Sequence, residues 1–134
     1  MKYYKGYITS RDCFGTYFPQ RIQNIVIRDF CSKKNFTYEL SAAEYTMKNS
    51  YLVLNEMIED IKRLDGIVAF SMFQLPVNKQ DRIGILKKIL KKKKIIYFVL
   101  ERLEVKNSND IINLNEIWSI KFSTFNSKIP KNLK

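Results

Sequence analysis

The chain has 134 residues, of which 46% are hydrophobic and 13% aromatic, and this composition can build one domain with a buried core. It contains no histidine, which excludes the usual zinc sites, the Ser-His-Asp and Cys-His nucleophile systems and the commonest general base. The formal net charge is +11, but six of the lysines lie in the run 87–94, and without them an ordinary +5 would remain.

Strand and helix signals alternate from the N-terminus onward. Residues 3–9, YYKGYIT, are rich in tyrosine and β-branched residues and predict a strand. Pro19 marks the start of a helix, whose apolar stripe is predicted at Ile22, Ile25, Val26 and Phe30. The later segments are predicted as a strand over 35–40, a helix over 50–64 capped by Ser50, a strand over 65–73, a helix over 78–92, a strand over 94–100 and a helix over 108–118.

This alternation predicts an α/β fold, a single three-layer domain over residues 1–120 with a four-stranded parallel sheet between helices. Residues 121–134 are expected to form a frayed C-terminal tail. No run reaches the length of a membrane span and the N-terminus lacks a signal-peptide pattern, so we expect a cytoplasmic protein without a membrane span.

Polar residues follow each predicted strand. Ligands of parallel α/β sheets bind outside the carboxyl ends of the strands, so these residues are candidates for a site. They are Thr9, Ser10, Arg11 and Asp12 after the first strand, Ser41, Glu44 and Tyr45 after the second, Ser71 and Gln74 after the third, and Glu101 and Arg102 after the fourth. The first helix would add Gln20, Gln23, Asn24 and Arg28 beside them.

Two of these residues carry the main chemical hypotheses. Arg11 is a candidate anion clamp, because a guanidinium matches phosphate or carboxylate; a solvated loop arginine is the alternative. Glu44 stands in a neutral segment of small residues, where partial desolvation would raise its pKa and suit it to proton transfer. A glutamate that caps a helix is the alternative for Glu44.

The remaining candidates also have plainer alternatives. The amides of Gln20, Gln23 and Asn24 suit sugar hydroxyls, and free N–H groups of a first helical turn suit anions; a polar helix face explains them equally. Arg28 can instead form a surface pair with Asp29. The lysine run 87–94 fits a nucleic-acid or membrane surface, but a solvated helix face explains it better. Four glycines form neither a phosphate loop nor a dinucleotide fingerprint, and no cofactor or metal site is expected.

Part of the sequence resembles the catalytic domain of serine recombinases, the resolvases and invertases. The similar parts are the strand and loop GYITSR, a glutamine-bearing first helix and the segment LDGIVAFSMFQL before a third helix. That family has the pattern Tyr-x-Arg-x-Ser, and the register puts Thr9 in place of the arginine and Arg11 in place of the nucleophile. The family's Asp-Arg pair would fall near Phe73 and Gln74. The resemblance therefore implies a resolvase-like or flavodoxin-like fold without strand cleavage, and no long dimer helix is expected after residue 120.

A second resemblance covers residues 3–120. The blocks GYITSR, PQRIQNIVIRDFC, LSAAEYTM, LDGIVAFSMFQLP and IIYFVLERLEV are similar to the sporadic carbohydrate cluster protein family, which occurs in bacterial gene clusters for surface polysaccharide. This resemblance implies a role in making or modifying a surface glycan such as O-antigen.

The main hypothesis is a metal-independent cytoplasmic enzyme of surface-carbohydrate biosynthesis, for O-antigen or capsule, that acts on an anionic nucleotide- or phosphate-linked sugar. Its catalytic residues would be Glu44, Ser10 and Tyr45, and its substrate-binding residues Arg11, Gln20, Gln23, Asn24, Arg28, Ser71 and Gln74. The alternative is a non-catalytic nucleic-acid-binding or regulatory domain on a recombinase-like fold. A scaffold subunit for other enzymes of the same gene cluster and a homodimer stay open, whereas nucleic acid is not the expected partner.

Overall fold

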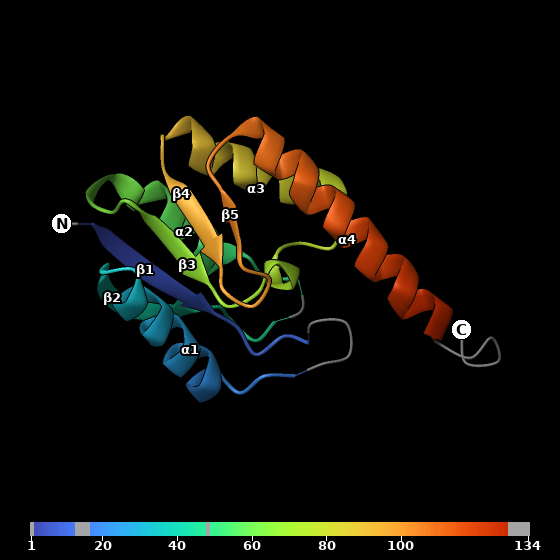
Figure 1. Cartoon of the computed structure of the whole chain (residues 1–134), viewed down its shortest axis with the longest axis horizontal. Coiled ribbons are helices and arrows are strands. Elements are labelled where there is room, and N and C mark those ends of the chain that lie inside the picture. The colour runs from blue at the N-terminus through green and yellow to red at the C-terminus, as the bar shows by residue number, and fades with distance from the viewer. Residues whose placement is uncertain (1, 13–16, 48, 129–134) are drawn as a thin grey trace.

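The computed structural model describes residues 2–12, 17–47 and 49–128 as one five-stranded sheet with helices on both faces (Figure 1). The strand order is β2-β1-β3-β4-β5. The strands are β1 (Tyr3–Ile8), β2 (Thr37–Ala43), β3 (Gly66–Ala69), β4 (Ile95–Phe98) and β5 (Leu103–Val105). The first four strands are parallel to one another, and β5 pairs with β4 in the antiparallel direction.

The helices divide between the two faces of this sheet. Four are α-helical: α1 (Gln20–Lys33), α2 (Leu52–Glu59), α3 (Lys79–Lys91) and α4 (Ser108–Lys128). Two short 3-10 segments, η1 (Ile61–Arg63) and η2 (Met72–Gln74), precede β3 and follow it. In Figure 1, α1 lies on one side of the sheet, α2 and α3 lie on the other, and α4 runs beyond the body of the domain. None of the helices in the described part of the chain is long and apolar enough to cross a membrane.

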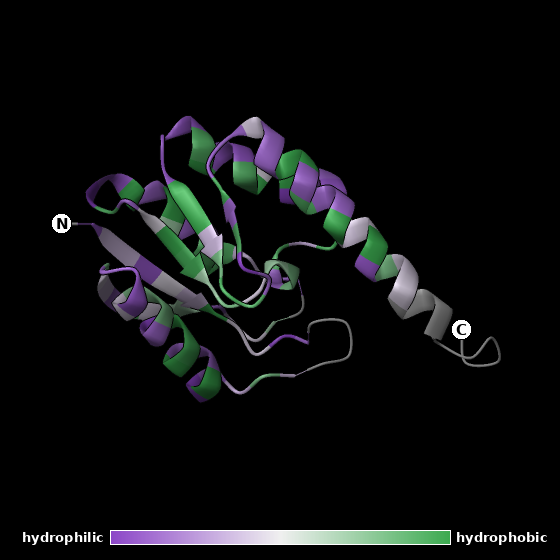
Figure 2. Cartoon of the chain, in the orientation of Figure 1, coloured by the Kyte–Doolittle hydropathy of each residue, from purple (hydrophilic) through white to green (hydrophobic). Residues whose placement is uncertain are grey.

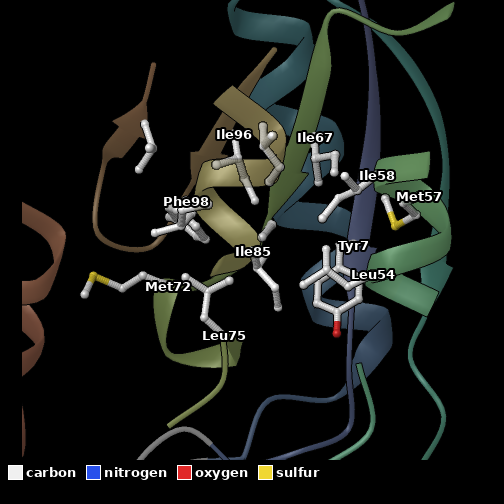
Figure 3. Close-up of a cluster of buried hydrophobic side chains, with 14 of the residues drawn as sticks. Tyr7, Leu54, Met57, Ile58, Ile67, Met72, Leu75, Ile85, Ile96 and Phe98 are labelled. Atoms are coloured by element: carbon white, nitrogen blue, oxygen red, sulfur yellow. The ribbon is translucent and has the colours of Figure 1, made fainter. Parts of the chain in front are cut away.

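Two hydrophobic clusters lie on opposite faces because successive side chains of a strand point to opposite sides. Tyr7 belongs to the larger cluster with α2, α3 and α4, whereas its neighbour Ile8 belongs to the smaller cluster with α1. Figure 3 shows Tyr7 beside Leu54 of α2 within the larger cluster. The apolar central strands and the mixed surface of the helices are visible in Figure 2. The α/β class predicted from the alternating pattern is confirmed.

The predicted four-stranded parallel sheet needs correction, because a fifth strand pairs at its edge. The chain turns back after β4 through Arg102, which has a φ of 55°, and enters the three-residue strand β5. A strand this short gives too little alternation to be recognised in a sequence.

Two helices also differ from their predictions. On α1 the buried positions are Gln23, Ile27 and Cys31, while Ile22 and Ile25 are exposed, so a polar residue takes the place expected for an apolar one. The last helix continues to Lys128 instead of ending at 118, so residues 121–128 of the predicted frayed tail are helical, and the absence of a long dimer helix stays a prediction. The remainder of the predicted frayed tail, 129–134, lies outside the described residues.

Candidate functional site

Arg11 joins the carboxyl ends of three strands. Its Nη1 donates to the backbone oxygen of Ser50 at 2.6 Å, and its Nη2 donates to the backbone oxygen of Gln74 at 2.7 Å. Nη2 also donates to the Tyr7 hydroxyl at 3.1 Å, and the guanidinium carbon lies 4.3 Å from the ring centroid of Tyr51. The predicted anion clamp therefore has both Nη atoms bonded to acceptors of the protein itself.

Glu44, the predicted proton-transfer residue, is 3% exposed and lies at the N-terminus of α2. Its carboxylate accepts hydrogen bonds from the backbone N–H groups of Val53 and Leu54 at 3.1 and 3.2 Å. It also accepts from the hydroxyls of Tyr7 at 2.9 Å and Ser50 at 3.1 Å.

These contacts decide the charge of Glu44. Burial alone would raise its pKa, but the hydrogen bonds from Val53, Tyr7 and Leu54 outweigh burial and hold the pKa below its ordinary value. The expectation of a raised pKa is therefore wrong. The carboxylate caps α2, which is the alternative that the sequence left open, and its catalytic role stays a prediction.

Gln23 has every hydrogen-bonding position of its amide occupied. Its Nε2 donates to the backbone oxygens of Thr9 and Phe18, both at 2.7 Å. Its Oε1 accepts from the backbone N–H of Thr9 at 3.2 Å and from Nε2 of Gln74 at 2.8 Å. An amide has two donor hydrogens and two acceptor lone pairs, so Gln23 is satisfied inside the protein. We call Tyr7, Arg11, Gln23, Glu44, Ser50 and Gln74 the strand-end network.

Ser71 lies beside this network and binds a second carboxyl group. Its hydroxyl donates to Oε2 of Glu101 at 2.7 Å, and the backbone N–H of Met72 donates to Oε1 of Glu101 at 2.7 Å. Burial raises the pKa of Glu101 more than these hydrogen bonds lower it. The raised carboxyl pKa expected at Glu44 thus occurs at Glu101, which lies outside the proposed set of catalytic and substrate-binding residues. Glu101 could have been selected from the sequence because it is an acidic residue close after an apolar predicted strand.

Five candidates contribute no side chain to these contacts, namely Ser10, Gln20, Asn24, Arg28 and Tyr45, although the backbone N–H of Tyr45 donates to Oε2 of Glu44 at 3.1 Å. Within the described ranges, none of their side chains makes a hydrogen bond to the strand-end network. Asn24 instead accepts from the Tyr38 hydroxyl at 3.3 Å. Arg28 and Tyr45 are exposed, and Ser10 and Gln20 are half-buried. The polar strand ends do meet at one edge, but only part of the predicted set takes part.

The lysine run lies at the amino ends of the parallel strands, where β3 and β4 begin, opposite the strand-end network. Lys92 Nζ donates to the backbone oxygen of Ile58 at 2.9 Å, at the C-terminus of α2, and Lys94 Nζ donates to the backbone oxygen of Lys62 at 3.3 Å. A lysine ammonium at a helix C-terminus meets free carbonyls and the negative end of the helix dipole. We call this surface the basic edge, made of Lys62, Lys88, Lys91, Lys92, Lys93 and Lys94.

No protein-family model and no curated protein matches the chain. Solved structures do match. The N-terminal catalytic domain of TP901-1 integrase is 14% identical, with a TM-score of 0.65, over 93% of this chain and 99% of that chain. A resolvase family site-specific recombinase from Streptococcus pneumoniae is 15% identical, with a TM-score of 0.61, over 92% of this chain and 91% of that chain.

These likenesses show the fold of resolvase catalytic domains, as the recombinase resemblance predicted. They contradict the carbohydrate hypothesis. The similar structures are an integrase domain and a site-specific recombinase, and no match supports the sporadic carbohydrate cluster family. The predicted role in surface-polysaccharide or O-antigen biosynthesis, the anionic sugar as partner and the dismissal of nucleic acid are therefore wrong, and the alternative of a recombinase-like domain is the better supported one.

Proposed function

We propose that the chain is a nucleic-acid-binding domain on a recombinase-like fold, which binds duplex DNA without cleaving it. The observation that carries this proposal is the fold itself. Two proteins with the same fold over nearly the whole chain are named as an integrase and a site-specific recombinase, and site-specific recombination is a reaction on DNA.

The end of β1 supports binding without cleavage. In the register of the recombinase pattern, Arg11 stands at the place of the nucleophilic serine, and its guanidinium is bonded to Ser50, Gln74 and Tyr7. Thr9, at the place of the arginine, is fully buried, and its hydroxyl accepts from the backbone N–H of Arg11 at 3.1 Å. An arginine cannot form the ester with phosphate that a serine forms, and a buried threonine cannot hold the phosphate as an arginine does.

The basic edge supplies the surface for the duplex. Its six lysines lie in the last turn of α3 and in the segments that follow α2 and α3, where Lys92 Nζ also donates to the backbone oxygen of Glu59 at 3.3 Å. Lys92 and Lys94 are engaged with backbone oxygens, whereas Lys88, Lys91 and Lys93 are exposed and form no ion pair within the described residues. Exposed ammonium groups on one surface neutralise phosphates and release their counterions.

The test is the salt dependence of binding to a fluorescent DNA duplex. Replacing Lys88, Lys91 and Lys93 together by glutamine should weaken binding at about 0.1 M salt by tenfold or more. The slope of log affinity against log salt should fall by about 1 for each phosphate that the variant no longer neutralises. The matched control replaces Lys79, Lys106 and Lys121 by glutamine. It removes the same three positive charges from positions outside the basic edge. Equally weakened binding in both variants would show that net charge alone drives binding and would reject the basic edge.

The statement on cleavage has its own test. Supercoiled DNA incubated with the wild-type chain should give neither nicks nor a covalent protein–DNA adduct on a denaturing gel. Ser10, the half-buried serine beside Arg11, is one of the residues predicted as catalytic and carries the hydroxyl nearest in sequence to Arg11. An adduct that disappears in Ser10→Ala would overturn the non-catalytic proposal and make Ser10 the nucleophile.

A further inference from the structure

Among the residues that the structure describes, no helix covers β4 and β5 on the face of the sheet that carries α1. This helix packs against β1 and β2, and Figure 1 shows no helix in front of β4 and β5 on that side. Sheets with parallel strands are normally buried on both faces, so an open portion is unusual. The side chains of Tyr97 and Val99, from β4 and just beyond it, are only half-buried there.

A groove of about 570 Å³ lies between this open face and the C-terminal half of α1. Two aromatic rings line it: Phe30 of α1 and Tyr97 of β4, whose centroids are 5.3 Å apart at 53°. Val99 extends the apolar surface on the β4 side. Neighbouring half-buried rings on an open sheet give a base a surface on which it can stack, whatever its sequence.

Positive charges stand at the rim of the same groove. Lys33, Lys34 and Arg102 line it together with two carboxylates, Asp29 and Glu104. Each carboxylate already has a lysine partner, since Asp29 lies 3.0 Å from Lys33 and Glu104 lies 3.2 Å from Lys106. Lys34 and Arg102 are exposed and have no ion pair among the residues that the structure describes, so their charges are available to an anion.

The two cations lie on the chain segments that carry the rings. Lys34 follows the last residue of α1, and its Nζ lies 5.9 Å from the ring centroid of Phe30. Arg102 sits in the turn after β4 with a φ of 55°, and its N–H donates to the backbone oxygen of Val99 at 3.1 Å. A non-glycine residue at positive φ is uncommon, and here it ends the turn that leads the chain back into β5.

We propose that this groove binds a segment of single-stranded nucleic acid, with a base stacked on Tyr97 and in edge contact with Phe30 and the flanking phosphates on Lys34 and Arg102. The inference rests on the proposed nucleic-acid-binding function and adds a second surface to it, separate from the basic edge. A duplex keeps its bases stacked inside and cannot offer them to the rings, so the groove selects unpaired nucleotides. The pairing of aromatic rings with Lys and Arg is the combination that single-strand binding requires.

The first test uses tryptophan emission. In Tyr97→Trp the new indole lies in the groove, and a stacked base quenches it. The natural Trp118 lies in the larger cluster on the opposite face, so titration of the wild type measures its background. Oligothymidylate should quench Tyr97→Trp in a saturable manner and leave the emission of the wild type and of Tyr17→Trp, an exposed site outside the groove, unchanged.

The second test removes the charges and leaves the rings. The double variant Lys34→Gln, Arg102→Gln should bind oligothymidylate about tenfold more weakly and keep its affinity for a duplex. The control Arg21→Gln, Lys79→Gln removes two exposed charges elsewhere and should change neither.

The outcomes separate this inference from the proposed function. The protein could bind a duplex through the basic edge but show no quenching of Tyr97→Trp and no effect of the double variant. That result would reject the single-strand groove and leave the proposed function standing. No binding of either nucleic acid would reject the proposed function, and the groove with it. A groove variant that instead changes the sedimentation of the protein would show that a second copy covers this face, which also overturns the inference.

Discussion

The side-chain amide of Gln74 donates a 2.8 Å hydrogen bond to Oε1 of Gln23 and so joins the segment after β3 to helix α1. Both side chains are almost completely buried, at 2% and 1% exposure. The same Gln23 oxygen accepts from the backbone of Thr9 at the end of β1. One oxygen atom therefore connects three segments that are distant in the sequence.

Replacing Gln23 by glutamate should destabilise the protein. The carboxylate would place an acceptor against the backbone oxygens of Thr9 and Phe18, which now accept from Nε2. Leaving one buried and one partly buried carbonyl without donors should lower the free energy of unfolding by about 2 kcal/mol. Urea unfolding followed by circular dichroism measures it, with Gln20→Glu as the control on the same helix. Equal midpoints for the two variants would contradict this account of Gln23.

Glu44→Gln should destabilise the protein at neutral pH. The new amide would turn its NH₂ group toward N–H donors of α2, so at least one hydrogen bond at the helix N-terminus is broken. Hydrogen bonds to a charged acceptor contribute about 1.5–3 kcal/mol, and we expect the free energy of unfolding to fall by about 2 kcal/mol. Chemical unfolding at pH 7 checks it, with the exposed Glu56→Gln on the same helix as the control.

The effect of Glu44→Gln should also depend on pH. Because the folded state lowers the pKa of Glu44 below the ordinary 4.5, the carboxylate stabilises the fold above that value. This stabilisation is lost as the pH falls through the lower pKa of the folded state. Wild type and Glu44→Gln should therefore begin to converge in stability as the pH falls below about 4.5 and should converge fully only below the pKa of the folded state. A difference that stays constant down to acid pH would show that packing, rather than the charge, is responsible.

Glu101→Gln should change the stability of the protein in the opposite direction to Glu44→Gln. Burial raises the pKa of Glu101 above 4.5, so the ionised carboxylate opposes folding at neutral pH. The neutral amide removes that cost and still accepts from the backbone N–H of Met72, so the variant should be more stable at pH 7 by about 1 kcal/mol or less. The gain should vanish below about pH 4.5, where Glu101 is protonated in both states. Thermal unfolding across pH 4–8 measures the difference, and a destabilised variant at pH 7 would contradict the prediction.

Arg82 should be required to hold α4 against α3. It is 3% exposed, its Nε donates to Asn115 at 2.9 Å, its Nη1 donates to the backbone oxygens of Pro76 and Val77, and burial lowers its pKa to about 10. Arg82→Met should lower the free energy of unfolding by about 2 kcal/mol, because three acceptors would be left without their donors.

The indole of Trp118, 3.9 Å from the guanidinium carbon of Arg82, reports on this contact as the single tryptophan of the chain. Its emission should shift to longer wavelength in Arg82→Met as α4 loosens. Arg82→Lys keeps the charge but not the planar fork and should be intermediate. The exposed Arg21→Met should leave both the emission and the stability unchanged, and a shift there would disqualify the readout.

The framework of the fold is predictable from the sequence because hydrophobic periodicity reports burial directly. The apolar strands β3 and β4 and the helix α3 lie where the pattern predicts them. The buried face of α1 is not predictable in this way, because Gln23 is polar and its burial depends on backbone oxygens contributed by distant segments. The prediction that Ser50 caps α2 is wrong for the same reason. The structure shows Ser50 donating to Glu44, whose carboxylate comes from the end of β2.

The sequence predicts the place of the candidate site but not its chemistry. Parallel strand order brings polar ends to one edge, and Arg11, Glu44, Gln23, Ser71 and Gln74 do gather there. Whether such a side chain faces a ligand or the protein depends on which backbone groups lie opposite it. Those backbone groups are brought together only by the tertiary structure. The inward direction of the Arg11 guanidinium therefore cannot be predicted from the loop sequence.

The strand-end network ties both hydrophobic clusters to the same set of hydrogen bonds. Arg11 contacts Tyr7 of the larger cluster, and Gln23 lies on the helix that covers the smaller one. Neither face of the sheet can open at this edge without breaking bonds that belong to the other face. We therefore expect the carboxyl edge to open as a single cooperative unit, so that the amide protons of Thr9, Val53 and Leu54 exchange with solvent together.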